Sequence, residues 1–114
     1  MAKKEELKKC MKVTVDKINE VGPDVALEWG GSIQFVFPDL GTGWLVKMAM
    51  DGTVESWDEK IDEEAATSVV ETDSDTWVGI INKTIHPLEA RAAGKVQTRK
   101  SIEGLIKIIP AVTM

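Results

Sequence analysis

Large apolar residues recur at every second position between residues 32 and 50, and this alternation limits the folds open to the chain more than any other feature. A period of two places these side chains on one face of a β-strand. The expected apolar faces are Ile33, Phe35 and Phe37 over residues 32–37, and Trp44, Val46, Met48 and Met50 over residues 44–50. Asp51-Gly52 then predicts a two-residue hairpin turn. A sheet with one strongly apolar side needs a second layer to cover it.

Helical patterns lie on both sides of this strand region. In order, we predict a helix (3–20), three strands (32–37, 44–50, 53–57), a fourth strand (66–72), a helix beginning at Asp73, a short helix (88–93), a fifth strand (95–99) and a last helix (102–109). The boundary signals are Gly-Pro-Asp at 22–24, the N-cap Asp73, the pair His86-Pro87 and the stop Pro110. Because hairpins join most strands, the predicted fold is α+β, a five-stranded, largely antiparallel sheet covered by helices.

Length and composition exclude several classes of function. The 114 residues predict one domain, residues 1–114. With one His and one Cys, the chain cannot form a Cys/His zinc site or a disulfide framework, and we expect no metal and no cofactor. A net charge of −5 argues against nucleic acid as a partner. We see no secretory signal and no transmembrane segment, so a cytoplasmic location is expected.

Candidate catalytic residues are few, and each has a simpler interpretation. The carboxylate pairs lie in polar stretches, where their pKa would not be raised for acid–base work. Cys10 and His86 would form a nucleophile and base only if the fold brought them together, and no third orienting residue is evident. Cys10 fits a small, half-buried apolar residue and His86 a helix start. We therefore expect a protein that is not an enzyme.

The C-terminal half resembles the sterol carrier protein type-two family, also called the sterol-binding or lipid-transfer domain. The resemblance rests on a β-prone run, the capped segment Asp-Ser-Asp-Thr-Trp-Val-Gly-Ile-Ile at 73–81, His-Pro-Leu-Glu-Ala at 86–90, Gly-Lys-Val-Gln-Thr at 94–98 and a closing apolar helix. Residues 33–37 and 44–52 resemble the family's first strands and hairpin. The chain departs from the pattern at Lys83 and Lys100, where the family often has glycine, and at His86, where it has Asn.

The resemblance implies an apolar tunnel between sheet and helices that binds a lipid, such as a fatty acid, an acyl-CoA or a sterol-like molecule, without catalysis. From their apolar faces alone, we assign Phe35, Val46 and Met48 to the sheet wall, Trp77, Ile80 and Ile81 to the helical wall, and Leu105, Ile106 and Ile109 to a lid. Lys95, Arg99 and Lys100 are the candidate basic residues for an anionic head group. A non-glycine residue at 83 or 100 would adopt a left-handed conformation or change the turn.

Two other interpretations stay open at this stage. The large apolar side chains would equally suit a filled core, and the chain would then be an accessory protein-interaction or dimerisation module on the same fold, with a second copy of the chain as a candidate partner in a homodimer. A small hydrolase that uses Cys10 and His86 is the third interpretation. Periodicity does not distinguish a filled core from a hollow one, so the deciding observation is whether an apolar cavity exists.

Overall fold

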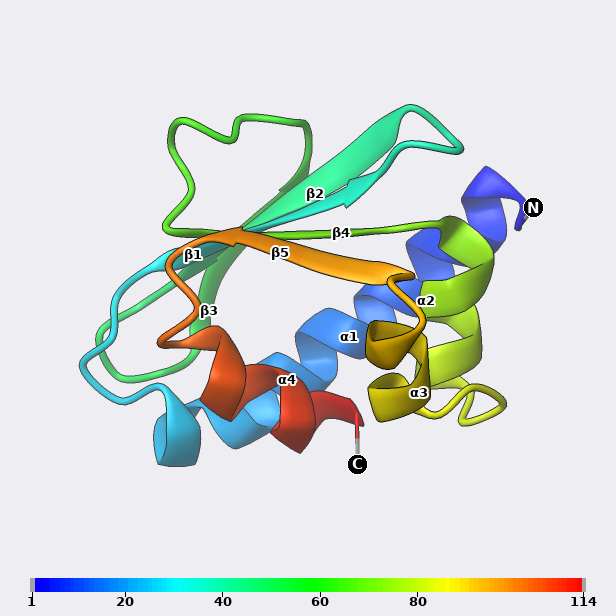
Figure 1. The fold of residues 1–114 in the computed structure, drawn as a ribbon. Helices are drawn as coiled ribbons and strands as arrows, with labels where there is room; N and C mark the ends of the chain where they lie inside the picture. The colour runs from blue at the N-terminus through cyan, green and yellow to red at the C-terminus, as the bar shows by residue number, and fades with distance from the viewer. Residues whose placement is uncertain (1, 114) are drawn as a thin grey trace.

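The computed structural model describes residues 2–113, which form one mixed sheet and four helices (Figure 1). The elements are α1 (Lys4–Val25), β1 (Ser32–Phe37), β2 (Thr42–Met48), β3 (Val54–Glu59), β4 (Ser68–Thr72), α2 (Ser74–Ile81), α3 (Pro87–Ala92), β5 (Val96–Lys100) and α4 (Leu105–Thr113). The strand order is β3-β2-β1-β4-β5. Neighbouring strands are antiparallel except for the parallel pair β1 and β4, so the predicted α+β fold is confirmed.

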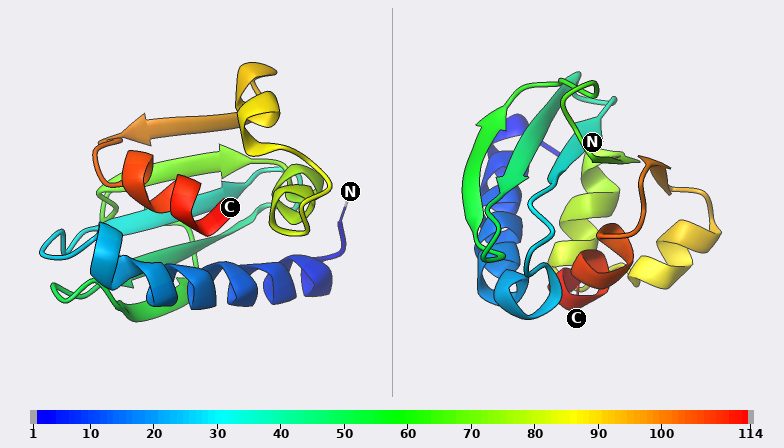
Figure 2. Two further views of the ribbon diagram at one scale, coloured as in Figure 1. Left: turned by 90° about the horizontal axis from the view of Figure 1, so that it is seen from below. Right: turned by 90° about the vertical axis from the view of Figure 1, so that its left-hand side faces the viewer.

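The helices lie on one face of the sheet (Figures 1 and 2). The segment that joins β3 to β4, residues 60–67, crosses the other face. Gln34 on β1 fixes this segment, because its side-chain amide donates to the Lys60 carbonyl at 2.9 Å and accepts from the Asp62 N–H at 2.7 Å. The outer face thus buries only a small apolar cluster, and the main core lies under the helices.

The burial of side chains in the core confirms the apolar faces that alternation predicts for β1 and β2. Phe35 and Phe37 on β1 are fully buried, and so is Val46 on β2. Two aromatic pairs fill the space beneath them, with ring centroids 5.4 Å apart for Phe35 and Trp77 and 6.0 Å apart for Phe37 and Trp44. From α1, the chain contributes the buried side chains Leu7, Cys10, Met11, Val15 and Ile18. The long amphipathic helix therefore covers this part of the sheet completely.

The predicted stop of the first helix at residues 22–24 is wrong. Helix α1 runs on to Val25 with Pro23 inside it. Gly22 is buried where α1 meets the β2–β3 turn, since an added Cβ would lie 1.7 Å from the Gly52 carbonyl oxygen. The glycine is needed for this close approach rather than for ending the helix. Pro23 is tolerated because the helix continues for only two more residues, so few hydrogen bonds are lost.

The boundaries of several other elements also differ from the prediction by a few residues. The second strand covers 42–48 instead of 44–50, and Met50 is 60% exposed in the turn. The last helix begins at Leu105 instead of Ile102 and passes through Pro110 to Thr113. Pro110 lies in the final turns of this helix, where the Thr113 hydroxyl donates to the Ile109 carbonyl at 2.8 Å. No helix within residues 2–113 is long and apolar enough to cross a membrane.

Candidate ligand-binding site

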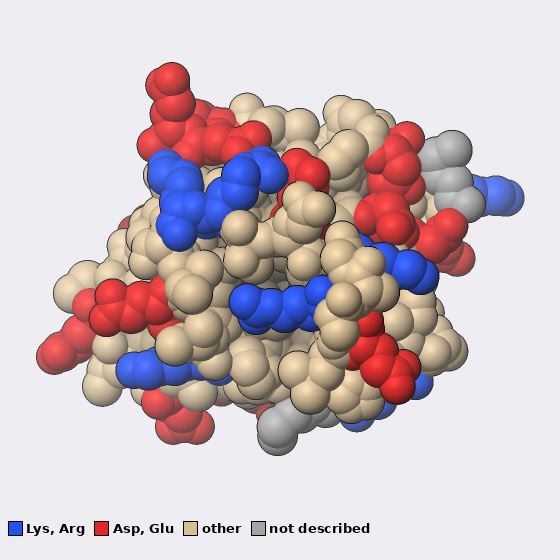
Figure 3. All heavy atoms as spheres, viewed as in Figure 1, with Lys and Arg blue, Asp and Glu red and all other residues tan. Residues whose placement is uncertain are grey.

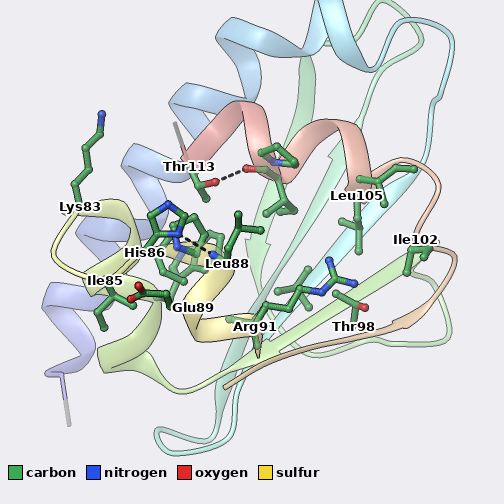
Figure 4. Close-up of a pocket in the computed structure, with 18 of the residues that line it drawn as sticks. Lys83, Ile85, His86, Leu88, Glu89, Arg91, Thr98, Ile102, Leu105 and Thr113 are labelled. Atoms are coloured by element: carbon green, nitrogen blue, oxygen red, sulfur yellow. Dashed lines mark hydrogen bonds between the residues drawn. The ribbon is translucent and has the colours of Figure 1, made fainter. Parts of the chain in front are cut away.

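A cavity of about 800 Å³ lies between the β4–β5 side of the sheet and the helices α2, α3 and α4 (Figure 4). Most of its lining is apolar: Val70, Trp77, Ile80, Ile85, Pro87, Leu88, Val96, Ile102, Leu105, Ile106, Ile109 and Pro110. The polar lining residues are Lys83, Thr84, His86, Glu89, Arg91, Thr98 and Thr113. A concave, mainly apolar site with a few polar groups has the size and character of a small-ligand pocket. The predicted tunnel through the domain stays a prediction.

Most of the predicted helical residues line the cavity, but none of the predicted sheet residues does. The predicted residues that line it are Trp77, Ile80, Leu105, Ile106 and Ile109. The predicted residues that do not are Phe35, Val46, Met48 and Ile81, all of which are buried elsewhere in the core. The strand order explains the difference, because β1 and β2 lie on the β3 side of β4, whereas the strands that line the cavity are β4 and β5. Sequence order places β1 and β2 first but does not place them beneath the cavity.

The sheet contributes three residues to the cavity that the sequence reasoning missed, Val70, Val96 and Thr98. Val70 pairs with Thr98 across β4 and β5, and Thr72 pairs with Val96. Alternation in strand 95–99 already places Val96 and Thr98 on one face. What the sequence lacks is the register that aligns this face with Val70 and with the core side of the sheet.

Helix α2 is held by polar contacts at its start and by the long helix along its length. The Asp73 carboxylate accepts from the Thr76 N–H at 2.7 Å, which confirms the predicted N-cap. The Asp39 carboxylate accepts from the Ser74 N–H at 3.0 Å. Further along α2, the Trp77 indole donates to the Thr14 hydroxyl on α1 at 3.1 Å. These bonds fix the orientation of Trp77, so its ring forms a rigid part of the cavity.

The loop after α2 turns back over the helix and supplies the next part of the lining. Lys83 has a φ of 65°, so it adopts the left-handed conformation that the departure from glycine predicts. The following residues fold onto Gly79, whose carbonyl accepts from the N–H groups of Thr84 at 2.8 Å and Ile85 at 3.1 Å. An added Cβ at Gly79 would lie 2.4 Å from the Ile85 side chain. This glycine therefore allows Ile85 to pack closely beside the cavity.

His86 has a structural role that the sequence anticipated. Its ring nitrogen Nδ1 accepts from the Leu88 N–H at 3.2 Å, which caps the start of α3, and Pro87 occupies the first turn. Leu88 itself is 72% exposed at the edge of the cavity. Ile106, on α4, is 56% exposed. Apolar side chains thus extend from the cavity to the protein surface.

Two of the three basic residues proposed to bind an anionic head group instead form ion pairs or hydrogen bonds away from the cavity. Arg99 pairs with Glu63 at 2.7 Å and with Glu71 at 2.9 Å, and these carboxylates raise its pKa. The Lys100 ammonium donates to the carbonyl oxygens of Glu63, at 2.8 Å, and Ala66. Lys100 also has a φ of 62°, and these bonds hold that left-handed residue in place. Neither residue lines the cavity.

Lys95 does not line the cavity either. It borders a shallower depression beside Asp39, Glu71 and Asp73. The basic residues that do line the main cavity are Lys83 and Arg91. The sequence pattern gave no signal for Arg91, because its position depends on how the short helix α3 is placed against β5.

The environment of Cys10 removes the main support for the hydrolase interpretation. Burial raises the pKa of the Cys10 thiol to about 11, and a hydrogen bond involving Thr14 offsets this only in part. A reactive cysteine needs a lowered pKa and access to substrate. The cysteine is 7% exposed on the core side of α1 and does not line the cavity. His86, in turn, uses Nδ1 to cap α3.

Comparison with known proteins identifies the fold. The crystal structure of sterol carrier protein 2 matches 92% of this chain and 88% of its own, with a TM-score of 0.67 and 22% identity. The solution structure of palmitated sterol carrier protein 2 like 2 from Aedes aegypti matches 97% of this chain and 95% of its own, with a TM-score of 0.69 and 18% identity. Neither a comparison with protein-family models nor one with curated protein sequences finds a match.

The sec-alkylsulfatase Pisa1 from Pseudomonas sp. contains a similar unit, with a TM-score of 0.63 and 17% identity. The match covers 78% of this chain but 14% of that enzyme, so this chain spans a small part of its length. The structure therefore belongs to the class of α+β folds in which helices cover one face of a five-stranded sheet. Within that class it has the fold of sterol carrier protein 2, which confirms the resemblance at the level of the fold.

Proposed function

We propose that this protein binds and carries a lipid or other hydrophobic ligand, such as a fatty acid, an acyl-CoA or a sterol-like molecule, in the cavity between β5 and the helices. The observation that carries the proposal is the apolar cavity of about 800 Å³. Its size falls within the range of roughly 300–1,000 Å³ that is typical of small-ligand sites. The palmitated relative with the same fold supports a lipid as the occupant.

Apolar burial alone supplies enough free energy for this function. Moving a 16-carbon chain from water into the cavity contributes on the order of 10 kcal/mol at ~0.8 kcal/mol per methylene, before the ligand's ordering costs. No bond needs to be broken and no proton needs to be moved. The buried thiol of Cys10 and the capping role of His86 support a carrier rather than a hydrolase.

The experiment that tests the proposal fills the cavity from the sheet side. Thr98 lines the cavity, whereas Gln97, its neighbour on β5, is exposed and does not line it. In Thr98→Trp, the indole occupies space that the ligand needs, and we expect the affinity for a fluorescent fatty acid to fall roughly tenfold or more. Gln97→Trp adds the same side chain to the same strand and should bind like the unaltered protein.

Native mass spectrometry of the purified protein gives an independent readout, since a co-purified lipid would add a defined mass. Circular dichroism checks that both tryptophan variants keep the fold. Equal binding by Thr98→Trp and the unaltered protein would show that the ligand lies elsewhere. If the unaltered protein neither binds the fluorescent fatty acid nor carries a co-purified lipid, the alternative is favoured, which is an interaction module.

A further inference from the structure

Arg91 lines the cavity and is also exposed to solvent. It lies in the last turn of α3, a helix whose start is fixed by the His86 cap and by Pro87. Figure 4 shows its side chain extending from α3 toward the end of the cavity where Thr98 and Leu105 lie. In Figure 3, a basic side chain crosses a hollow near the centre of this face, with uncharged and acidic side chains around it. The guanidinium is thus held next to the apolar space rather than directed away from it.

Arg91 has no protein partner for its charge within residues 2–113. The ion pairs among these residues involve Lys4, Lys12 and Arg99. The chain has only two arginines, and the other, Arg99, holds two carboxylates. A guanidinium presents donors in a planar fork that fits a carboxylate or a phosphate. Arg91 keeps this whole fork available at the cavity.

The other charged groups around the cavity are placed differently. Figure 4 shows Lys83 directed away from the cavity and Glu89 near Ile85, on the side opposite Thr98. Thr98, on β5, lies at the Arg91 end of the cavity and offers a hydroxyl there. An anion here would meet one cation, one hydroxyl and apolar surface.

The net charge of −5 makes a local cation favourable for an anionic ligand. A protein with that charge repels anions at long range, so an anion stays only where a nearby cation offsets the repulsion. We infer that Arg91 binds the anionic head group of a single-chain lipid whose tail lies along Ile80, Leu105 and Ile109. This assignment rests on the proposed function and adds the ligand's charge and its orientation.

The test compares ligands that share a 16-carbon tail and differ in the head group: palmitate, hexadecyl phosphate and neutral 1-hexadecanol. In Arg91→Gln, we expect affinity for palmitate or hexadecyl phosphate to fall roughly tenfold, because a charge-assisted bidentate contact is lost. Affinity for 1-hexadecanol should stay within about twofold, since the apolar contacts remain. In Arg91→Glu, the loss for the anions should be larger because a repulsive charge replaces the attractive one.

Lys95→Gln is the matched control, because it also removes a cation from this part of the chain, but at a position that does not line the cavity. It should leave the affinity for all three ligands unchanged. An equal loss for the alcohol and the anions in Arg91→Gln would overturn the assignment, and so would equal losses in the two Gln variants. If the unaltered protein binds none of the three ligands, the assignment fails, and the proposed function fails with it only if native mass spectrometry also finds no co-purified lipid. If it binds the alcohol and the anions and Arg91→Gln binds all of them unchanged, only the assignment fails.

Discussion

The two halves of the sheet are covered in different ways. We call the side formed by β1, β2 and β3 under α1 the filled half, and the side formed by β4 and β5 under α2, α3 and α4 the hollow half. In the filled half, one helix of 22 residues presents a continuous apolar stripe to the sheet. In the hollow half, helices of 8, 6 and 9 residues meet at their ends and leave the cavity between them. Three short helices cover this half of the sheet less completely than one long helix covers the other.

The two halves also differ in the interactions that stabilise them. The filled half is stabilised by apolar packing around fully buried side chains such as Phe35 and Val46. The short helices of the hollow half depend more on local polar bonds, such as the caps at Asp73 and His86. Helices this short are marginal without such bonds or tertiary contacts. The difference predicts that stability resides mainly in the filled half and ligand binding mainly in the hollow half.

The largest expected effect separates the halves by stability. Phe37→Ala removes a fully buried ring that packs on Trp44 within the filled half, and we expect a loss of about 3–5 kcal/mol in the free energy of unfolding. Ile106→Ala truncates a side chain that is 56% exposed beside the cavity, and its loss should stay below about 1 kcal/mol. Urea unfolding measures both. Similar losses for the two variants would mean that the halves do not divide stability in this way.

The second expected effect separates the halves by accessibility. The pKa of the buried Cys10 thiol is raised from 9.0 to about 11, so at pH 8 its thiolate fraction is roughly 100-fold below that of an unperturbed thiol. Reaction with a disulfide reagent should therefore be slow in the folded protein and become faster as the pH rises toward 11. Denaturation should restore an ordinary rate.

The matched control moves the cysteine to the hollow half. In the double variant Cys10→Ser with Ile106→Cys, the new thiol lies at an exposed position beside the cavity and should react at an ordinary rate. A bound lipid should slow that reaction by covering the side chain. Rapid modification of Cys10 in the folded protein would contradict the filled half as described.

The smallest expected effect concerns the two left-handed lysines. Lys83→Gly relieves a left-handed conformation that costs an L-residue ~1–2 kcal/mol, while glycine loses ~0.5–1 kcal/mol of chain entropy, so a net gain of up to about 1 kcal/mol is expected. In Lys100→Gly, loss of the bonds to the Glu63 and Ala66 carbonyls should cancel this gain. Thermal unfolding measures both. An equal gain at Lys100 would show that its ammonium bonds add no stability.

The sequence by itself determined the elements and their apolar faces. Alternation located β1 and β2, and the capping pattern located α2 at Asp73. The departure from glycine at Lys83 and Lys100 predicted either a left-handed residue or a changed turn, and the structure shows left-handed residues. These signals are local, because they depend on the conformation of a few neighbouring residues. The same local rules failed at Gly22, where a contact with the distant turn at Gly52 decides the conformation.

The tertiary structure alone decided which apolar residues fill the core and which line the cavity. Phe35 and Ile80 have the same character in the sequence, yet one is packed under α1 and the other faces the cavity. Their difference follows from strand order and register, which join segments far apart in the chain. The same holds for the basic residues, since pairing with Glu63 and Glu71 engages Arg99, whereas Arg91 faces the cavity unpaired within residues 2–113.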